Sequence, residues 1–252
     1  MARVLSALLL LALPAAAAAQ DATPSVYREL AEAKTPDDVW ERSLQALIAQ
    51  SRAGFIADPD LGRAEELCPG AMDAIFGRIA PLIREGHFRQ RVEYREGLTR
   101  IFAAEFTPRQ AEEALAFYTS PMGHQMLLLG ADANSYTHRV QDVLGSGDAP
   151  APPLDRGTFD ADLAGTQSAI HRGLDPDLAF QANRILRQSR WYATYAGIVH
   201  PQIQDLRYAI AARDSAADGG SSARVANAAT AALQAHFNDC EGAQALSADR
   251  QG

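Results

Sequence analysis

The chain has 252 residues, a formal net charge of −8 and 21% charged side chains. The acidic excess argues against a nucleic-acid-binding protein and against adsorption to anionic lipid head groups, because both functions need a basic surface. The length is sufficient for one large domain, or for two small domains, with a buried core.

Residues 1–19 have the pattern of a secretory signal peptide. Arg3 supplies a positive start, residues 4–13 form an uncharged apolar run, and small residues follow up to Ala19. The apolar run is much shorter than the roughly 20 residues that a membrane-spanning helix needs. We therefore expect cleavage after Ala19 and a soluble periplasmic or secreted protein that keeps no stable membrane anchor.

Apolar residues recur at helical spacing along almost the whole chain, and no run alternates with the period of a β-strand. Trp40, Leu47 and Phe55, for example, fall on one stripe of a helix that follows Pro36. The sequence therefore predicts an all-α fold, a bundle of about eight helices in two packed subdomains.

Shifts in composition divide the chain into segments. After the signal peptide we expect a flexible mature N-terminus at 20–34, a helical domain at 35–145, a linker rich in Pro and Gly at 146–157, a C-terminal helical subdomain at 158–241 and a flexible tail at 242–252.

A clear helix start lies at Phe106-Thr107-Pro108. Thr107 is expected to cap the helix, Pro108 suits its first turn, and Gln110 completes a capping box three residues after the cap. This spacing predicts that a helix begins at Pro108.

A second helix start follows at Ser120-Pro121, because Pro121 cannot continue the preceding helix but suits a first turn, and Ser120 can cap it. Phe117 and Tyr118 are large enough to pack in a core, and Gly123 permits two segments to approach closely. We interpret these residues as determinants of the fold rather than as a ligand site.

The runs 106–108 and 117–123 together resemble the signature of a bacterial exported helical family, domain of unknown function 2059. Its members carry Phe-Thr, an acidic helix and then Phe-Tyr-x-Ser-Pro-x-Gly. The resemblance covers residues 71–144 and implies export and an all-helical fold, with no catalytic residues. His124 stands where the family usually has Lys or Arg, which puts any role of that cation in doubt here.

The two cysteines, Cys68 and Cys240, favour one disulfide, because exposed thiols oxidise outside the cytoplasm. Two buried free thiols and a metal-binding pair are the alternatives. His236 and Cys240 have the i, i+4 spacing of a metal half-site, but a bonded sulfur cannot be a thiolate ligand.

Two further features receive no functional interpretation. Lys34 is the only lysine, and we attribute this to the composition of the genome. The aromatic residues Trp191, Tyr192 and Tyr195 are of a kind that packs in cores more often than it lines a groove, so we prefer core packing.

The sequence contains no Gly-x-Ser-x-Gly elbow, no phosphate-binding glycine loop and no Cys-x-x-Cys. We therefore name no catalytic residue, no metal ligand and no cofactor. We expect a non-catalytic periplasmic module that binds a protein, a peptide or a small apolar ligand in the cell envelope. The alternative is a periplasmic hydrolase with a site of His and carboxylate groups from distant helices, for which His124, His138 and His200 are the residues to test.

Overall fold

The computed structural model describes residues 25–145, 152–216 and 221–240. Within these ranges all regular secondary structure is helical, which confirms the all-α prediction. The signal segment, residues 146–151 of the 146–157 linker and the 242–252 tail lie outside the described residues. None of the described helices is both long and apolar enough to cross a membrane.

The helices follow one another in chain order. The first half contains α1 (Ser25–Lys34), α2 (Asp37–Ala57), α3 (Pro59–Leu67), α4 (Ala71–Glu105), α5 (Pro108–Tyr118), α6 (Pro121–Ala133) and α7 (Thr137–Gly145). The second half contains α8 (Arg156–Gly173), α9 (Pro176–Gln188), the short α10 (Tyr192–Thr194), the π-helical turn η1 (Tyr195–Val199), α11 (His200–Ala216) and α12 (Ser221–Asp239).

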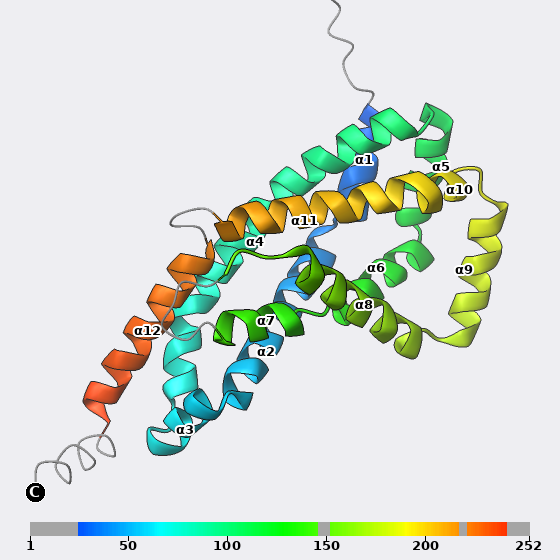
Figure 1. Cartoon of the computed structure of the whole chain (residues 1–252). Coiled ribbons are helices and arrows are strands. Elements are labelled where there is room, and N and C mark those ends of the chain that lie inside the picture. Colours follow the sequence, from blue (N-terminus) through cyan, green and yellow to red (C-terminus); the bar gives the residue numbers. More distant parts are fainter. Residues whose placement is uncertain (1–24, 146–151, 217–220, 241–252) are drawn as a thin grey trace, which may run out of the picture.

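The helices form two groups that face each other. The long helix α4 runs through one group, where α12 and α11 pack along it (Figure 1). Helix α1 packs against both α4 and α5. The other group consists of α2, α6, α7 and α8, each of which contacts its neighbours in the group. Helices from the N-terminal and C-terminal halves of the sequence therefore share one assembly around α4.

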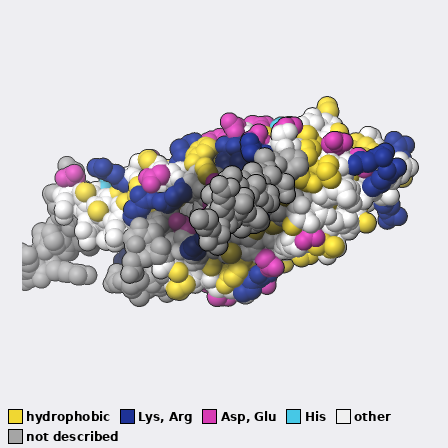
Figure 2. Space-filling model, turned by 90° about the horizontal axis from the view of Figure 1, so that it is seen from above, with side chains coloured by type: hydrophobic (Ala, Val, Ile, Leu, Met, Phe, Trp, Pro, Cys, Tyr) yellow, Lys and Arg dark blue, Asp and Glu magenta, His cyan; other side chains and the backbone are white. Residues whose placement is uncertain are grey.

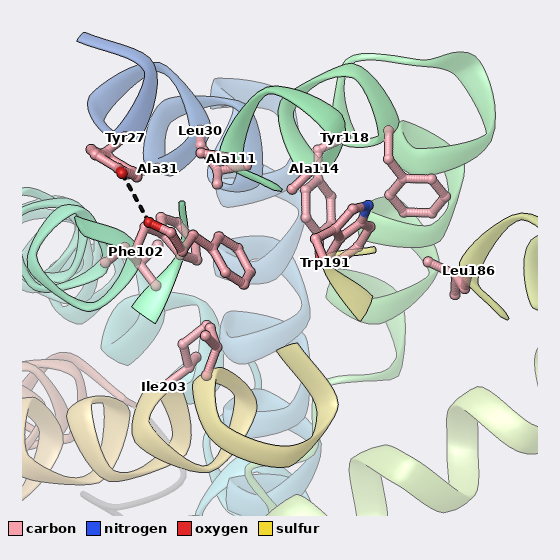
Figure 3. Close-up of a cluster of buried hydrophobic side chains, with 14 residues drawn as sticks. Tyr27, Leu30, Ala31, Phe102, Ala111, Ala114, Tyr118, Leu186, Trp191 and Ile203 are labelled. Carbon is pink, nitrogen blue, oxygen red and sulfur yellow. Dashed lines mark hydrogen bonds between the residues drawn. The ribbon is translucent and has the colours of Figure 1, made fainter. Parts of the chain in front are cut away.

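Helix α1 occupies residues 25–34, where the sequence analysis expects a flexible segment. Leu30 and Ala31 follow Tyr27 by one helical turn, and all three are buried against the neighbouring helices. The hydroxyl of Tyr27 also donates a hydrogen bond of 2.8 Å to the carbonyl oxygen of Phe106 (Figure 3). The prediction of a flexible segment was wrong for these residues, because the short apolar stripe packs in a buried core cluster.

The predicted capping box at the start of α5 is present. The side chain of Thr107 accepts from the backbone N–H of Gln110, and the Gln110 side chain accepts from the backbone N–H of Thr107. At the start of α6, Ser120 Oγ accepts from the backbone N–H of Gly123 at 3.1 Å. A Cβ atom on Gly123 would lie 2.0 Å from the carbonyl oxygen of Phe117, so the turn between α5 and α6 requires glycine.

The aromatic residues of the same motif belong to a buried core cluster. Phe117 and Tyr118 contact the indole ring of Trp191 at centroid distances of 5.6 Å and 5.9 Å, and Figure 3 shows Tyr118 and Trp191 next to each other. Phe106 contacts Trp191 as well. Trp191 is thus a core residue, as the sequence analysis preferred.

The sulfur atoms of Cys68 and Cys240 lie 2.09 Å apart, the bonding distance of a disulfide, as the even cysteine count predicts. Cys68 follows α3 and is fully buried, whereas Cys240 follows α12. The bond therefore holds the end of α12 beside the start of α4. His236, the other member of the metal half-site considered above, places its Nε2 atom 3.3 Å from the carbonyl oxygen of Cys68.

Candidate ligand-binding cavity

A cavity of about 660 Å³ lies between the two groups of helices. Its walls come from α2, α6, α7 and α8 on one side and from α4, α11 and α12 on the other, with Lys34 at the end of α1. This volume falls within the range of roughly 300–1,000 Å³ that is typical of small-molecule sites.

The helical stripes predicted from the sequence form the cavity wall. Trp40, Leu47 and Phe55 on α2 line the cavity, and each keeps part of its surface uncovered by protein. Ile83 on α4 and Leu163 on α8 do the same. A regular apolar stripe normally packs on a neighbouring helix, and here part of several stripes faces a shared internal space instead.

One end of the cavity is apolar. Ile79 is buried in a core cluster that α4 shares with α12, and Phe55, Ile83, Val225 and Ala229 pack against that cluster. All five residues also line the cavity. The disulfide holds α12 in place near this end, because it joins Cys240, directly after α12, to Cys68, shortly before α4.

The other end is polar and is organised around Lys34. The Nζ atom of Lys34 donates hydrogen bonds to the phenol oxygens of Tyr195 at 2.9 Å and of Tyr118 at 3.3 Å. It also lies over both aromatic rings, 4.6 Å from the centroid of Tyr118 and 5.1 Å from that of Tyr195. Cation–π attraction and hydrogen bonding therefore hold the ammonium group in place.

The charge of Lys34 is coupled to the tyrosines. Burial opposes this charge, but the oxygens of Tyr118, Tyr195 and Tyr94 outweigh burial and raise the pKa of Lys34 above its ordinary value. Burial likewise opposes ionisation of Tyr195, but the Lys34 ammonium lowers the pKa of this phenol. At Tyr118 burial prevails and raises the pKa. Lys34 is thus a permanent cation at the cavity wall.

Arg207 and His200 on α11 also line the cavity, and the His200 ring lies 5.8 Å from the ring of Tyr195. Arg207 makes a 3.4 Å contact with the side-chain oxygen of Gln204, and its charge acts on both Tyr94 and Tyr195. Burial lowers the pKa of His200, and the nearby charges of Lys34 and Arg207 lower it further. His200 is therefore neutral at pH 7, beside two cations.

The middle of the cavity wall carries polar groups that satisfy one another. Asp162 accepts hydrogen bonds from the backbone N–H groups of His138 and Arg139 and contacts His138 Nδ1 at 3.0 Å. Ser135 Oγ lies 3.4 Å from the same carboxylate. In a hydrolytic triad the serine contacts the second nitrogen of the histidine, whereas here serine and histidine share one carboxylate.

Of the three histidines that the sequence analysis names for a hydrolase, only His200 lines the cavity. His124 lies at the surface, where its Nε2 atom is 2.8 Å from Asp38 Oδ2. His138 is bound to Asp162, as described above. Within residues 25–145, 152–216 and 221–240, no group of three or more His, Cys, Asp or Glu side chains gathers in a way that suits a metal ion.

The outer surface differs from the polar end of the cavity. Figure 2 shows basic and acidic side chains next to each other over the described part of one face, with apolar patches between them. Surface arginines form ion pairs, such as Arg84 with Glu41 at 2.7 Å and Arg156 with Asp205 at 2.8 Å. Charge is thus balanced locally at the surface.

No protein-family model matches this chain, and neither a curated protein nor a solved structure shows significant similarity to it. Membership of the exported helical family that the motif at 106–123 resembles therefore stays a prediction.

Proposed function

We propose that this chain is an exported, non-catalytic binding protein that holds a small apolar ligand in the cavity between its two groups of helices. The observation that carries this proposal is the cavity itself, which is about 660 Å³ in volume and is walled by apolar stripes from both groups. A site of this size with mostly apolar walls and a few polar groups is typical of small-molecule binding.

Parts of the apolar stripes stay uncovered inside the cavity. Trp40, Leu47, Phe55 and Ile83 expose apolar surface to the cavity, and covering such surface stabilises a protein by about 25 cal/mol per Å². A ligand that fills the space recovers this free energy. Because the uncovered apolar surface comes from several helices around one cavity, a small apolar ligand covers more of it than a single partner helix would.

Binding is also favoured over hydrolysis by the polar groups in the wall. Ser135 and His138 both contact Asp162, so no serine is aligned on a free histidine nitrogen there. We further propose export through the signal-like residues 1–19, and membership of the family that the motif at 106–123 resembles.

Gly130 on α6 offers a direct test, because it lines the cavity and an added Cβ atom would meet no atom within 4 Å. Gly130→Leu should occupy part of the cavity without disturbing the helix. Gly77→Leu on α4 is the matched control, since Gly77 is exposed, has equally open surroundings and does not line the cavity.

The measurement is a titration of each purified protein with the neutral apolar dye N-phenyl-1-naphthylamine, followed by fluorescence. We expect the wild type and Gly77→Leu to bind the dye equally, and Gly130→Leu to bind it at least about tenfold more weakly, which corresponds to roughly 1.4 kcal/mol. Absence of binding by the wild type, or equal binding by Gly130→Leu, would contradict the proposal.

A further inference from the structure

The two ends of the cavity differ in charge. Lys34 and Arg207 both act electrostatically on Tyr94, Tyr195 and His200, so the two cations lie at the same end. The opposite end is walled by apolar residues such as Phe55 and Val225 on α2 and α12. The cavity is therefore amphipathic along its length.

Neither cation has an acidic partner in the part of the chain that the structure describes. No carboxylate oxygen of the described residues forms an ion pair with Lys34 or Arg207. Arg139, the other cation in the wall, differs, because it is surrounded by the charges of four aspartates. The phenols of Tyr118 and Tyr195 already stabilise the Lys34 ammonium. An anion in the cavity would add the counter-charge that Lys34 and Arg207 lack among the described residues.

At the same end, the described residues leave some hydrogen-bond donors of the two cations unused. Lys34 donates to two phenol oxygens, although an ammonium group has three N–H donors. Arg207 has five N–H donors in a planar fork, and its contact with Gln204 is long at 3.4 Å. A planar fork of this kind is suited to the two oxygens of a carboxylate or a phosphate group.

The length of the cavity can be estimated along α4. Tyr94 lies at the polar end and Ile79 at the apolar end, and the helical rise places them about 22 Å apart. An occupant that reaches both ends is therefore extended, with its polar group at one end and an apolar chain behind it.

We propose that the occupant is a single-chain amphiphile whose small oxyanion head group binds Lys34 and Arg207 and whose apolar tail extends toward Phe55, Ile79 and Val225. This inference rests on the proposed function, and it adds the chemical class of the ligand. The head group is a carboxylate or a phosphate monoester, because each can present two oxygens to a guanidinium fork.

The test compares ligands that have the same sixteen-carbon chain and different head groups. Palmitate, hexadecyl phosphate, 1-hexadecanol and hexadecylamine are each used to displace N-phenyl-1-naphthylamine from the full-length protein. We expect palmitate or hexadecyl phosphate to bind at least about tenfold more tightly than the alcohol, because hydrogen bonds to charged groups are the strong ones. The tighter of the two identifies the head group.

Arg207→Gln should weaken binding of the preferred anion by about tenfold or more and leave 1-hexadecanol within about twofold of the wild type. Arg213→Gln is the matched control, because Arg213 lies on the same helix, pairs with Glu93 and does not line the cavity. Lys34→Gln should weaken binding of the anion as Arg207→Gln does. If Lys34→Gln fails to fold, the inference is still tested by Arg207→Gln and by whether the wild type binds the anions more tightly than 1-hexadecanol.

Failure of this inference and failure of the proposed function give different results. If the dye binds but the anions bind no better than the alcohol, or the amine binds best, the oxyanion site is wrong and the apolar cavity stands. Equal behaviour of Arg207→Gln and Arg213→Gln also overturns the inference. If the dye itself does not bind, the proposed function fails.

Discussion

The Nζ atom of Lys34 lies 2.9 Å from the phenol oxygen of Tyr195, which is 161 residues later in the chain. This hydrogen bond joins the end of α1 to η1 and places a cation at the wall of the cavity. The same contact therefore stabilises the packing of α1 and positions the cation at the polar end of the cavity.

Removal of the Tyr195 hydroxyl should destabilise the protein. Tyr195→Phe keeps the ring under the Lys34 ammonium but removes its shorter hydrogen bond. Because the acceptor of an enclosed charge is lost, we expect the free energy of unfolding to fall by about 1–3 kcal/mol in urea denaturation. Tyr192→Phe, close by on α10, is the control and should stay within about 0.5 kcal/mol of the wild type. Equal effects of the two substitutions would refute the role of the Tyr195 hydroxyl.

Gly123→Ala should disrupt the turn between α5 and α6. The new methyl group would lie 2.0 Å from the carbonyl oxygen of Phe117 and 2.9 Å from Cα of Tyr118, so the backbone must move. We expect a loss of about 3 kcal/mol in thermal or urea unfolding. Gly77→Ala, where an added Cβ meets nothing within 4 Å, should stabilise helix α4 by up to about 1 kcal/mol. A neutral Gly123→Ala would show that the turn does not need glycine.

Loss of the disulfide should destabilise the protein substantially. The bond joins residues that are 172 positions apart, so its removal increases the conformational entropy of the unfolded chain. In the chain-entropy model this lowers the free energy of unfolding by up to about 5 kcal/mol. Thermal unfolding with and without a reductant measures this effect, and the double variant Cys68→Ala with Cys240→Ala should match the reduced protein. Non-reduced peptide mapping should recover the two cysteines joined, and two alkylatable thiols in the native protein would contradict the bond.

Stability should fall on acidification because of His87. Burial lowers the pKa of His87 to about 4, and its Nε2 atom lies 3.2 Å from the carbonyl oxygen of Trp40. The unfolded chain, with the ordinary value near 6.5, therefore binds more protons between pH 6.5 and pH 4. The contribution of neutral His87 is complete above pH 6.5 and is lost as the pH falls toward 4, by at most about 3 kcal/mol.

His87→Gln tests this pH dependence, because glutamine is a polar side chain that does not titrate. The free energy of unfolding, measured by urea denaturation at a series of pH values, should fall less steeply between pH 6.5 and 4 than in the wild type. His171→Gln is the control, since His171 is exposed on α8, and its profile should follow the wild type. Identical slopes for all three proteins would assign the acid sensitivity to other groups.

Local signals in the sequence predicted the helical fold well. The caps at Thr107 and Ser120 depend on residues within three positions, and both helices begin where these caps predict. The short stripe of Tyr27, Leu30 and Ala31 is also local, but it stabilises α1 only through contacts with α4 and α5, which lie far away in the sequence. For this reason the segment was mistaken for a flexible one.

The candidate site was not predictable in the same way. The stripe of Trp40, Leu47 and Phe55 specifies an apolar helix face, but periodicity does not distinguish a face that packs on a helix from one that borders a cavity. Lys34 was visible as the single lysine of the chain. Its importance depends on Tyr118 and Tyr195, whose positions relative to Lys34 are set by the tertiary fold.

The measurement that tests the central claim most directly is a native mass spectrum of the protein purified from the periplasm, to which we propose that it is exported. The account predicts extra mass that disappears on denaturation and corresponds to a single-chain anionic amphiphile, with lower occupancy in Gly130→Leu than in Gly77→Leu. A native mass equal to that of the processed chain, unchanged after incubation with palmitate or hexadecyl phosphate, would contradict the account.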